Sequence, residues 1–347
     1  MKTVIKQLTE AFGPSGYETE VTGLIKTMVE EYVDEIKTDV LGNLFAIKKG
    51  SQDGRTIMFA AHTDEIGIVV THIDDKGFLR FGNVGGVGIS TLVGNRVRFA
   101  GGAVGAIYQE KGSWKELTID KLYIDIGAEN KEEALQKVKL GEFGIFHREF
   151  EDLGDRLIAK SMDDRVGCAV LIDALKKIRN PKNTLYFVFT SQEEVGLRGA
   201  RTAAYGLEPD LGIALDVTLT GDMPEARRME VSLGKGAAIK VKDSSLITHP
   251  KVKDLLVNLA EENKIPYQME VLEAGGTDAG AIHVTKAGVP SGAISIPTRY
   301  VHSPSEMVDI RDVKACVDLV VALANKDLTR PSFAKGLPHP AGQARIR

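Results

Sequence analysis

Histidine and acidic side chains recur in five short segments of this sequence. The segments are AAHTDEIG with His62 and Asp64, SMDDRVG with Asp163 and Asp164, TSQEEVG with Glu193 and Glu194, ALDVT with Asp216, and PTRYVHSP with His302. Imidazole nitrogens and carboxylate oxygens together are the donors that zinc and similar divalent metals prefer. Acids gathered without a cation would repel one another. The residue types therefore predict a metal site, provided that the fold brings the five segments together.

The number of acids favours two metal ions over one. A single catalytic zinc commonly takes three protein ligands and a water, whereas about five ligand candidates are present here. Two metals about 3.5–4 Å apart, bridged by a carboxylate and a water, suit amide hydrolysis, because one metal polarises the carbonyl and the bridging water becomes the nucleophile. The residues alone leave open whether Asp163 or Asp164 is the bridge.

The adjacent pair Glu193 and Glu194 suits a division of roles. Neighbouring side chains of an extended chain point to opposite sides. One carboxylate can therefore bind a metal while the other takes a proton from the attacking water and delivers it to the leaving amine. Each segment also has a simpler interpretation: the aspartates as a helix N-cap, the glutamates as a solvated first helical turn, and a histidine exposed after a strand. The joint occurrence of all the segments argues against those separate interpretations.

Four apolar runs predict the elements that position these residues. The runs are Thr56–Ala61, Thr184–Thr190, Leu211–Leu215 and Ser291–Ile296, each suited to a strand buried on both faces. Helical patterns lie at about 165–178, 250–263, 278–287 and 311–327. Strands that alternate with helices predict an α/β domain, with a mixed sheet flanked by helices. Ligands bind beyond the carboxyl ends of strands in such sheets, so the histidines and acids would meet at one edge.

A further helix is expected near the N-terminus. Ser15 and Glu18 match a capping box, and apolar residues from Val21 to Tyr32 recur at helical spacing. This is the first helix that the pattern predicts.

Residues 71–160 have a different sequence pattern from the rest of the chain. Fourteen of the 36 glycines fall there, and they separate short β-like pieces; a single helical stretch covers Lys131–Val138. This pattern predicts a small β-barrel or sandwich inserted into the α/β domain, although the strands could instead extend the main sheet. We therefore expect a catalytic domain of residues 1–70 and 161–330. The last 17 residues, 331–347, are expected to form a mobile tail that need not belong to the natural protein.

Composition excludes several classes of protein. The net charge of −4 leaves no basic footprint for nucleic acid, and no apolar run or signal peptide points to a membrane or to export. Only Cys168 and Cys316 are present, so a disulfide framework is excluded and a cytoplasmic location is expected.

Two further features could contact a substrate. Gly275, Gly276 and Thr277 lie in the loop EAGGTD, where exposed backbone N–H groups could hold a carbonyl or carboxylate. The loop could equally be an ordinary helix entry with Thr277 or Asp278 as its cap. Arg299, close to His302, is a candidate cation for a substrate carboxylate.

The segments resemble, in this order, the motifs of the co-catalytic dinuclear metallo-aminopeptidases. The motifs are AAHTDEIG, SMDDRVG, TSQEEVGLRGA, ALDVT, EAGGTDAG and PTRYVHSP, and the similarity runs from about residue 3 to 328. The closest group is the tetrahedral aminopeptidases, together with the glutamyl and deblocking aminopeptidases, some of which are labelled endoglucanase M. The resemblance implies a zinc-exopeptidase-like fold.

The resemblance also implies a role for each matched residue. His62, Asp163 and Asp216 would hold one metal, and Asp163, Glu194 and His302 the other. Asp163 rather than Asp164 would be the bridge, because the family often has Asn at the position of Asp164. Glu193 would be the general acid and base, and Asp64 would orient His62. The cofactors implied are two divalent ions per subunit, zinc or cobalt.

The same resemblance implies that a β-barrel insert mediates dimers. Six such dimers would form a hollow tetrahedral dodecamer, although smaller homo-oligomers stay open. The expected partners are short peptides and further copies of the chain, with neither nucleic acid nor membrane.

The expected function is a cytoplasmic aminopeptidase that removes N-terminal residues from short peptides. A related metal-dependent deacylase or carboxypeptidase stays open, since Arg299 could bind the substrate carboxylate that such an enzyme recognises. An endo-glucanase is a remote alternative, because a glycosidase needs two carboxyls but no histidine ligands. A non-catalytic binding protein is weaker still, because every residue of a catalytic site is present. At the substrate N-terminus we expect an apolar or broad preference.

Overall fold

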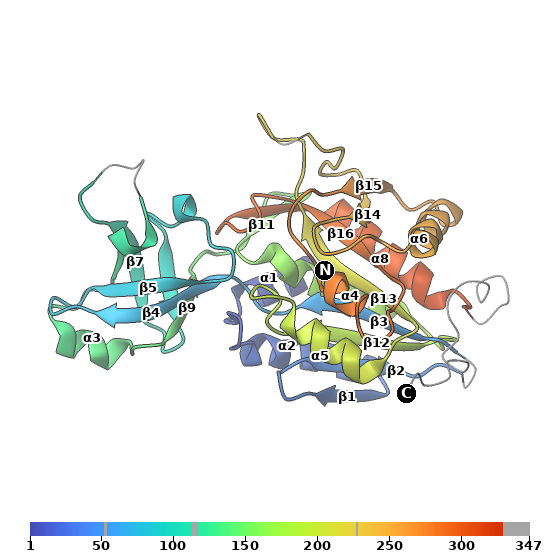
Figure 1. Ribbon diagram of the computed structural model, residues 1–347, viewed down its shortest axis with the longest axis horizontal. Coiled ribbons are helices and arrows are strands. Elements are labelled where there is room, and N and C mark those ends of the chain that lie inside the picture. The colour runs from blue at the N-terminus through green and yellow to red at the C-terminus, as the bar shows by residue number, and fades with distance from the viewer. Residues whose placement is uncertain (52–53, 113–116, 227, 329–347) are drawn as a thin grey trace.

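The computed structural model describes residues 1–51, 54–112, 117–226 and 228–328. The expected tail 331–347 therefore lies outside the described residues. Two bodies are visible: a large α/β part and a small barrel joined to it on one side (Figure 1). Within the described residues no helix is both long and apolar enough to cross a membrane.

The large part is built on an 11-stranded mixed sheet. Across the sheet the strands are β1 (Glu35–Thr38), β2 (Leu44–Lys48), β12 (Thr184–Thr190), β3 (Thr56–His62), β13 (Leu211–Thr218), β16 (Ser291–Arg299), β17 (Glu306–Asp309), β11 (Arg156–Ala159) and β10 (Glu151–Asp152), while β14 (Ala237–Lys242) and β15 (Tyr267–Val271) extend it from β16. The four predicted apolar runs form the parallel centre, β12–β3–β13–β16, and β2, β14 and β17 pair with it antiparallel. The expected mixed sheet is confirmed.

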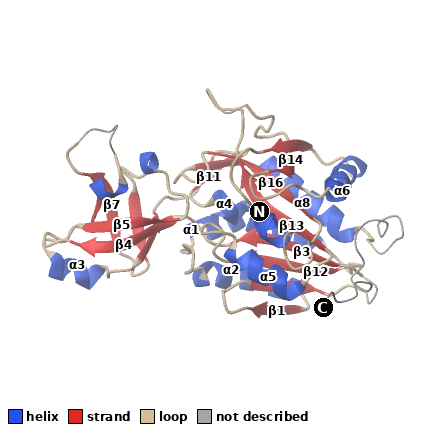
Figure 2. Cartoon of the chain, viewed as in Figure 1, coloured by secondary structure: helices blue, strands red, loops and turns tan. Residues whose placement is uncertain are grey.

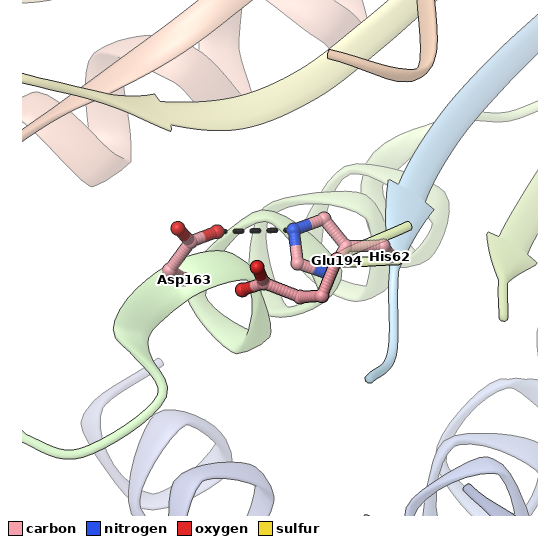
Figure 3. A group of neighbouring side chains, drawn as sticks. All are labelled: His62, Asp163 and Glu194. Carbon is pink, nitrogen blue, oxygen red and sulfur yellow. Dashed lines mark hydrogen bonds and ion pairs between the residues drawn. The ribbon is translucent and has the colours of Figure 1, made fainter. Parts of the chain in front are cut away.

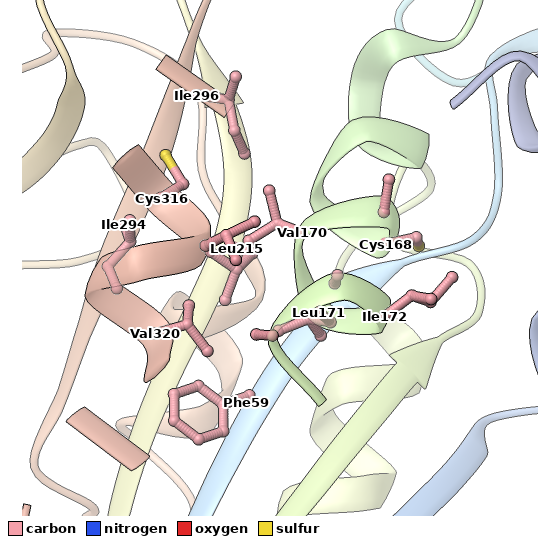
Figure 4. Close-up of a cluster of buried hydrophobic side chains, with 14 of the residues drawn as sticks. Phe59, Cys168, Val170, Leu171, Ile172, Leu215, Ile294, Ile296, Cys316 and Val320 are labelled. Atoms are coloured by element: carbon pink, nitrogen blue, oxygen red, sulfur yellow. The ribbon is translucent and has the colours of Figure 1, made fainter. Parts of the chain in front are cut away.

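Helices cover both faces of this sheet (Figure 2). On one face lie α1 (Lys2–Glu10), α2 (Thr19–Val29), α4 (Met162–Lys177), α6 (Pro250–Glu262) and α8 (Ile310–Asn325); on the other lie α5 (Arg198–Leu207) and α7 (Asp278–Ile282). The apolar core is formed where Val170 and Leu171 of α4 and Val320 of α8 pack on Phe59 and Ile294 of the sheet (Figure 4). Burial of large apolar side chains on both faces explains why these strands read as continuous apolar runs.

The small part is a closed six-stranded barrel with its own core. Around the barrel the strands are β4 (Gly67–Ile73), β5 (Leu79–Val84), β8 (Leu122–Asp125), β7 (Val104–Gln109), β6 (Arg96–Phe99) and β9 (Phe143–Phe146), with α3 (Lys131–Lys137) and short 3-10 turns at Ile89–Thr91 and Ile119–Lys121 between them. An inserted β-barrel is thereby confirmed, and these strands do not extend the main sheet.

The boundaries of the insert differ from the expected 71–160. Barrel strands run from Gly67 to Phe146, whereas Arg156–Ala159 pairs with Glu306–Asp309 in the main sheet. Glycine-containing turns occur in both parts of the chain, so the turn at Gly154 gave no sign that it joins strands of the other sheet.

The expected capping box does not form. A helix, α1, begins already at Lys2, and α2 begins at Thr19 with no side-chain cap bond. Ser15 instead donates its hydroxyl to Asp64, and the carboxylate of Glu18 accepts the backbone amides of Gly16 and Gln192. Ser15 and Glu18 therefore bond to Asp64 and Gln192, which lie far away in the sequence, instead of capping the helix.

Candidate active site

The sheet brings the predicted ligands to one edge. β3 ends at His62, which lies beside Thr190, the last residue of the parallel strand β12. Asp216 lies near the end of β13, and His302 lies in the loop that follows β16. Asp163 approaches the same edge from the first turn of α4. Because parallel strands end at the same side of a sheet, residues far apart in the sequence become neighbours.

Asp163 lies between the two histidines. Its Oδ1 is 3.0 Å from Nε2 of His62, and its Oδ2 is 3.3 Å from Nε2 of His302. Glu194 lies beside them, with Oε2 3.3 Å from the same nitrogen of His302. One ligand atom each of His62, Asp163 and Glu194 lies within 4.8 Å of the others (Figure 3). A carboxylate with one imidazole at each oxygen has the arrangement that a bridging ligand needs.

Asp164 is turned away from this cluster. Its carboxylate accepts the amide of His62 through Oδ2, at 3.2 Å, and that of Gly167 through Oδ1, at 3.1 Å. The second bond, three residues along the chain, is the bond that an N-cap side chain makes, and the backbone of Asp163 and Asp164 is not helical. The N-cap interpretation therefore fits Asp164, while Asp163 is left to face the histidines.

Glu193 and Glu194 reach different histidines. Oε2 of Glu193 lies 3.9 Å from Nε2 of His62, whereas Glu194 approaches His302. Their backbone amides are held by the carboxylate of Asp64, at 2.9 Å and 3.1 Å. The two side chains therefore diverge from one anchored peptide segment, as the adjacent pair predicted.

Each histidine ring is oriented by a main-chain oxygen next to its Nδ1. Nδ1 of His62 lies 3.2 Å from the main-chain oxygen of Asp64 and 3.4 Å from its carboxylate. Nδ1 of His302 lies 3.0 Å from the main-chain oxygen of Gly86, which belongs to the barrel. An Nδ1–H that donates to these oxygens leaves Nε2 as the free acceptor, which is the state that binds a metal.

Asp216, near the end of β13, is close to the cluster without bonding to it. Its Oδ1 accepts the amide of Val217 at 2.7 Å. Burial, and next the charge of Asp163, raise the pKa of Asp216 well above its ordinary value. It lines the same cavity as the other acids.

The charge balance of the cluster fits a cation. Burial raises the pKa values of Glu193 and Glu194, against the opposing effects of His62 and His302 respectively. Burial would lower the pKa of His302, but its hydrogen bonds to Asp163 and Glu194 raise that pKa to about 12. In addition, Oε1 of Glu194 is buried and has no partner among the described residues. The described cavity lining contains no lysine or arginine to balance these acids. Buried acids with an unpartnered oxygen are suitable ligands for a divalent metal.

A cavity of about 510 Å³ opens over the acids. Its outer wall is apolar and is formed by Leu197, Leu219, Leu272 and Val301. The predicted Gly275 and Gly276 also line it, and Gly275 has a φ of +76° that favours glycine.

Thr277 and Arg299 do not line this cavity. Thr277 is buried behind the loop. The guanidinium of Arg299 binds the carboxylate of Asp222, with Nη2 to Oδ2 at 2.7 Å. The candidate cation Arg299 is therefore already bound to a carboxylate of this chain, from a residue 77 positions away.

Glu306 belongs to the site but was not predicted. Its buried carboxylate accepts the backbone amide of Asp163 at 3.0 Å and that of His302 at 2.7 Å. It therefore ties together the two segments that carry Asp163 and His302. Glu306 lies four residues after His302, in HSPSE, a spacing that carries no recognisable signal without the fold.

Asp278 is a second unpredicted neighbour of the cluster. It is buried, accepts the hydroxyl of Thr190 at 2.5 Å, and leaves Oδ1 without a partner among the described residues. Burial raises the pKa of Asp278 to about 6. The sequence pattern singled out this aspartate only as an alternative helix cap.

Comparisons with known proteins identify the family of this chain. A family model described as M42 glutamyl aminopeptidase matches residues 42–319. A protein of Acetivibrio thermocellus, whose name places it among the aminopeptidases, is 53% identical over 323 residues, which are 92% of this chain and 97% of that protein.

Solved structures are similar over the same extent. Aminopeptidase APDkam598 from the archaeon Desulfurococcus kamchatkensis gives a TM-score of 0.93 at 40% identity, covering 99% of this chain and 98% of that one. The Pyrococcus horikoshii TET1 peptidase, described as able to assemble into a tetrahedron or a large octahedral shell, gives 0.84 at 34% identity, covering 93% and 99%. The chain therefore belongs to the M42 glutamyl aminopeptidase family and is a hydrolase that acts on peptide bonds.

Proposed function

We propose that this protein is an aminopeptidase that uses two divalent metal ions per subunit to remove N-terminal residues from short peptides. The observation that supports this most directly is the position of Asp163, whose two carboxylate oxygens each face a different histidine. His62, Asp163 and Asp216 would hold one ion, and Asp163, Glu194 and His302 the other. Zinc or cobalt bound there would polarise the scissile carbonyl and lower the pKa of the attacking water.

Glu193 is the residue that would move the proton. It lies on the cavity wall next to His62, and its amide is fixed by Asp64. Burial raises the pKa of Glu193 well above its ordinary value, which favours a carboxylate that must both accept a proton and release it. It would take the proton from water and return it to the amine that leaves.

The shape of the cavity indicates the substrate. The inner end carries the carboxylates, which can hold the free amine of a peptide, and the outer wall is apolar. The described lining contains no arginine or lysine, and Arg299, outside it, is already bound to Asp222, so no cation is free there for a substrate carboxylate. This arrangement favours an aminopeptidase over a carboxypeptidase and an apolar N-terminal residue over an acidic one.

We expect leucine p-nitroanilide to be cleaved with a kcat/KM at least about tenfold above that of glutamate p-nitroanilide, because a carboxylate in an apolar wall loses solvation without gaining a cation. The assay follows nitroaniline release after chelation and again after addition of Co²⁺ or Zn²⁺. N-acetyl-leucine p-nitroanilide and carboxymethylcellulose are the controls.

Each alternative function has its own signature in that assay. Cleavage of the acetylated substrate alone would favour a deacylase. Metal-independent sugar release would indicate a glycosidase. Faster cleavage of the glutamate substrate would show that the side-chain preference is not set by the apolar wall.

A substitution of Glu306 tests how the segments that carry Asp163 and His302 are held together. We expect Glu306→Gln to weaken metal binding by about 10- to 100-fold, because one of the two backbone amides loses its acceptor and the spacing between Asp163 and His302 relaxes. Metal content after dialysis against a graded chelator series measures the effect.

Asp312→Asn is the matched control for that variant. Asp312 is also fully buried and also accepts two backbone amides, those of Gly234 at 2.6 Å and Gly236 at 2.7 Å, but it lies outside the metal cluster. Both variants are expected to lower the free energy of unfolding by about 1–3 kcal/mol. Equal metal retention in the two variants would reduce Glu306 to a purely structural role.

We also propose that the chain forms homo-oligomers through its barrel. The TET1 peptidase, similar over nearly its whole length, is described as assembling into closed shells. Here the barrel exposes Val104, Tyr108 and Leu140 by 40%, 54% and 66%, and burial of these side chains between subunits would remove apolar surface from water. Mass photometry is expected to show dimers and a dodecamer of 37.6 kDa subunits. The compartment that we expect for these oligomers is the cytoplasm. A single monomer peak at micromolar concentration would contradict this proposal.

A further inference from the structure

A second cavity, of about 450 Å³, lies where the barrel meets the α/β part. It shares no lining residue with the cavity over the metal cluster. Arg98 of β6 and His147 and Arg148, which follow β9, line it from the barrel side. Lys160, which precedes α4, lines it from the α/β side.

The two arginines in this cavity lack an acidic partner among the described residues. Arg98 donates to the main-chain oxygen of Glu10 at 3.1 Å and lies 5.8 Å from the ring centre of Phe12. Arg148 donates to the amide oxygen of Asn95 at 2.9 Å. These partners are neutral, so neither guanidinium is bound to a carboxylate.

Lys160 adds a buried positive charge to the same place. Its side chain is only 4% exposed, and its Nζ donates to Glu65 at 2.7 Å. Glu65 is shared with the fully buried Arg165, at 3.2 Å, so one carboxylate serves two cations. Burial lowers the pKa of Lys160 to about 8, and the charges of Arg165 and Arg98 act in the same direction against that of Glu65. Positive charges are therefore in excess at the base of the cavity.

His147 offers a hydrogen-bonding atom that nothing in the described chain uses. Its Nδ1 is buried and has no partner among the described residues. Burial and the charges of Arg96 and Arg98 lower the pKa of His147, so its ring is neutral near pH 7 and can present one N–H.

None of the acids that line the same cavity forms an ion pair with Arg98, Arg148 or Lys160 among the described residues. Glu10 accepts the amide of Phe150 at 3.3 Å and lies 3.5 Å from Lys6. Glu20 accepts the amide of Phe12 at 3.1 Å. Glu149 is exposed at the edge. Of the basic groups, Lys160 is buried, Arg98 and His147 are half-buried, and Arg148 is exposed, as Glu149 is.

We propose that this cavity is a binding site for a small multivalent oxyanion of the phosphate class, held by Arg98, His147, Arg148 and Lys160. Charge-assisted hydrogen bonds to an oxyanion would compensate the excess positive charge that the chain leaves there. Because the ligand would touch residues of both the barrel and the α/β part, it would join the two across their boundary. The site is independent of the peptidase activity proposed above.

Calorimetric titration of inorganic phosphate into the full-length, metal-loaded protein tests the site, with ionic strength held constant by NaCl. We expect saturable binding with one site per chain. Arg148→Gln is expected to weaken it by about tenfold, since one charge-assisted pair is lost and this exposed side chain contributes little to the fold. His147→Phe, which keeps an aromatic ring but removes both ring nitrogens, is expected to weaken it as well.

Arg201→Gln is the matched control, because it makes the same change of charge at an exposed position on α5, away from the cavity. It is expected to keep the Kd within about twofold of the unmodified protein. Absence of saturable binding would overturn the proposal. So would equal affinity in Arg148→Gln and Arg201→Gln, since phosphate would then be bound elsewhere, for example at the metal cluster.

Discussion

Replacing Glu193 with glutamine is expected to lower kcat by about 10²- to 10⁴-fold while both metal ions stay bound. The substitution keeps the size of the side chain but removes the group that accepts the proton. Metal ligation is unaffected in our assignment, because Glu194 rather than Glu193 faces His302. The measurement is kcat on leucine p-nitroanilide together with metal content by mass spectrometry.

Loss of a buried negative charge could in principle slow the enzyme by itself, and Glu18→Gln controls for that. Glu18 is also buried, and it accepts the amide of Gln192 at 3.1 Å, next to the catalytic segment, but it does not line the cavity. We expect Glu18→Gln to retain kcat within a few fold. If Glu193→Gln also keeps a near-normal kcat, another residue is the base.

Asp163→Asn is expected to release both metal ions together and to abolish turnover. Asp163 is the residue whose two oxygens face the two histidines, so it alone would belong to both ligand sets. An amide can offer one neutral oxygen in place of two charged ones, and neither ion would keep its full ligand set. Metal stoichiometry after gel filtration and leucine p-nitroanilide turnover measure the outcome.

The neighbouring Asp164→Asn makes the same chemical change one residue later. Asp164 bonds to the amides of His62 and Gly167 rather than to the histidine rings, and asparagine is itself a good N-cap. We expect this variant to keep both metals and to lose only about 1 kcal/mol of the free energy of unfolding. Loss of both metals in Asp164→Asn, with both retained in Asp163→Asn, would move the bridge to Asp164.

The fold class and the main members of the site could be predicted because they depend on short-range patterns. Runs such as Leu211–Leu215 are apolar on both faces only if helices cover both faces of the sheet. Once those strands are parallel, the residues at their ends must lie close together. His62, Asp216 and the Glu193 segment could therefore be placed without knowledge of a single contact.

The residues that were missed or misplaced depend on long-range partners. Glu306 matters because of the two amides it accepts, one of them 143 residues away along the chain. Arg299 has the charge that a substrate site could use, but Asp222 binds it. Ser15 carries a local capping motif that Asp64 overrides. In each case the direction of a side chain is set by a partner that the local sequence does not reveal.

The contact between Gly86 and His302 limits how the sequence of the barrel can vary. The barrel has its own closed sheet and core, so most of its surface could vary without disturbing the peptidase. Gly86 is different, because a Cβ there would lie 2.6 Å from Nδ1 of His302, whereas a Cβ at Gly88 would meet nothing nearer than 3.8 Å. Two glycines of one turn are thus under unequal constraint. A foreign barrel could replace the insert only if it carried the same turn, because the main-chain oxygen of Gly86 contacts the ring of His302.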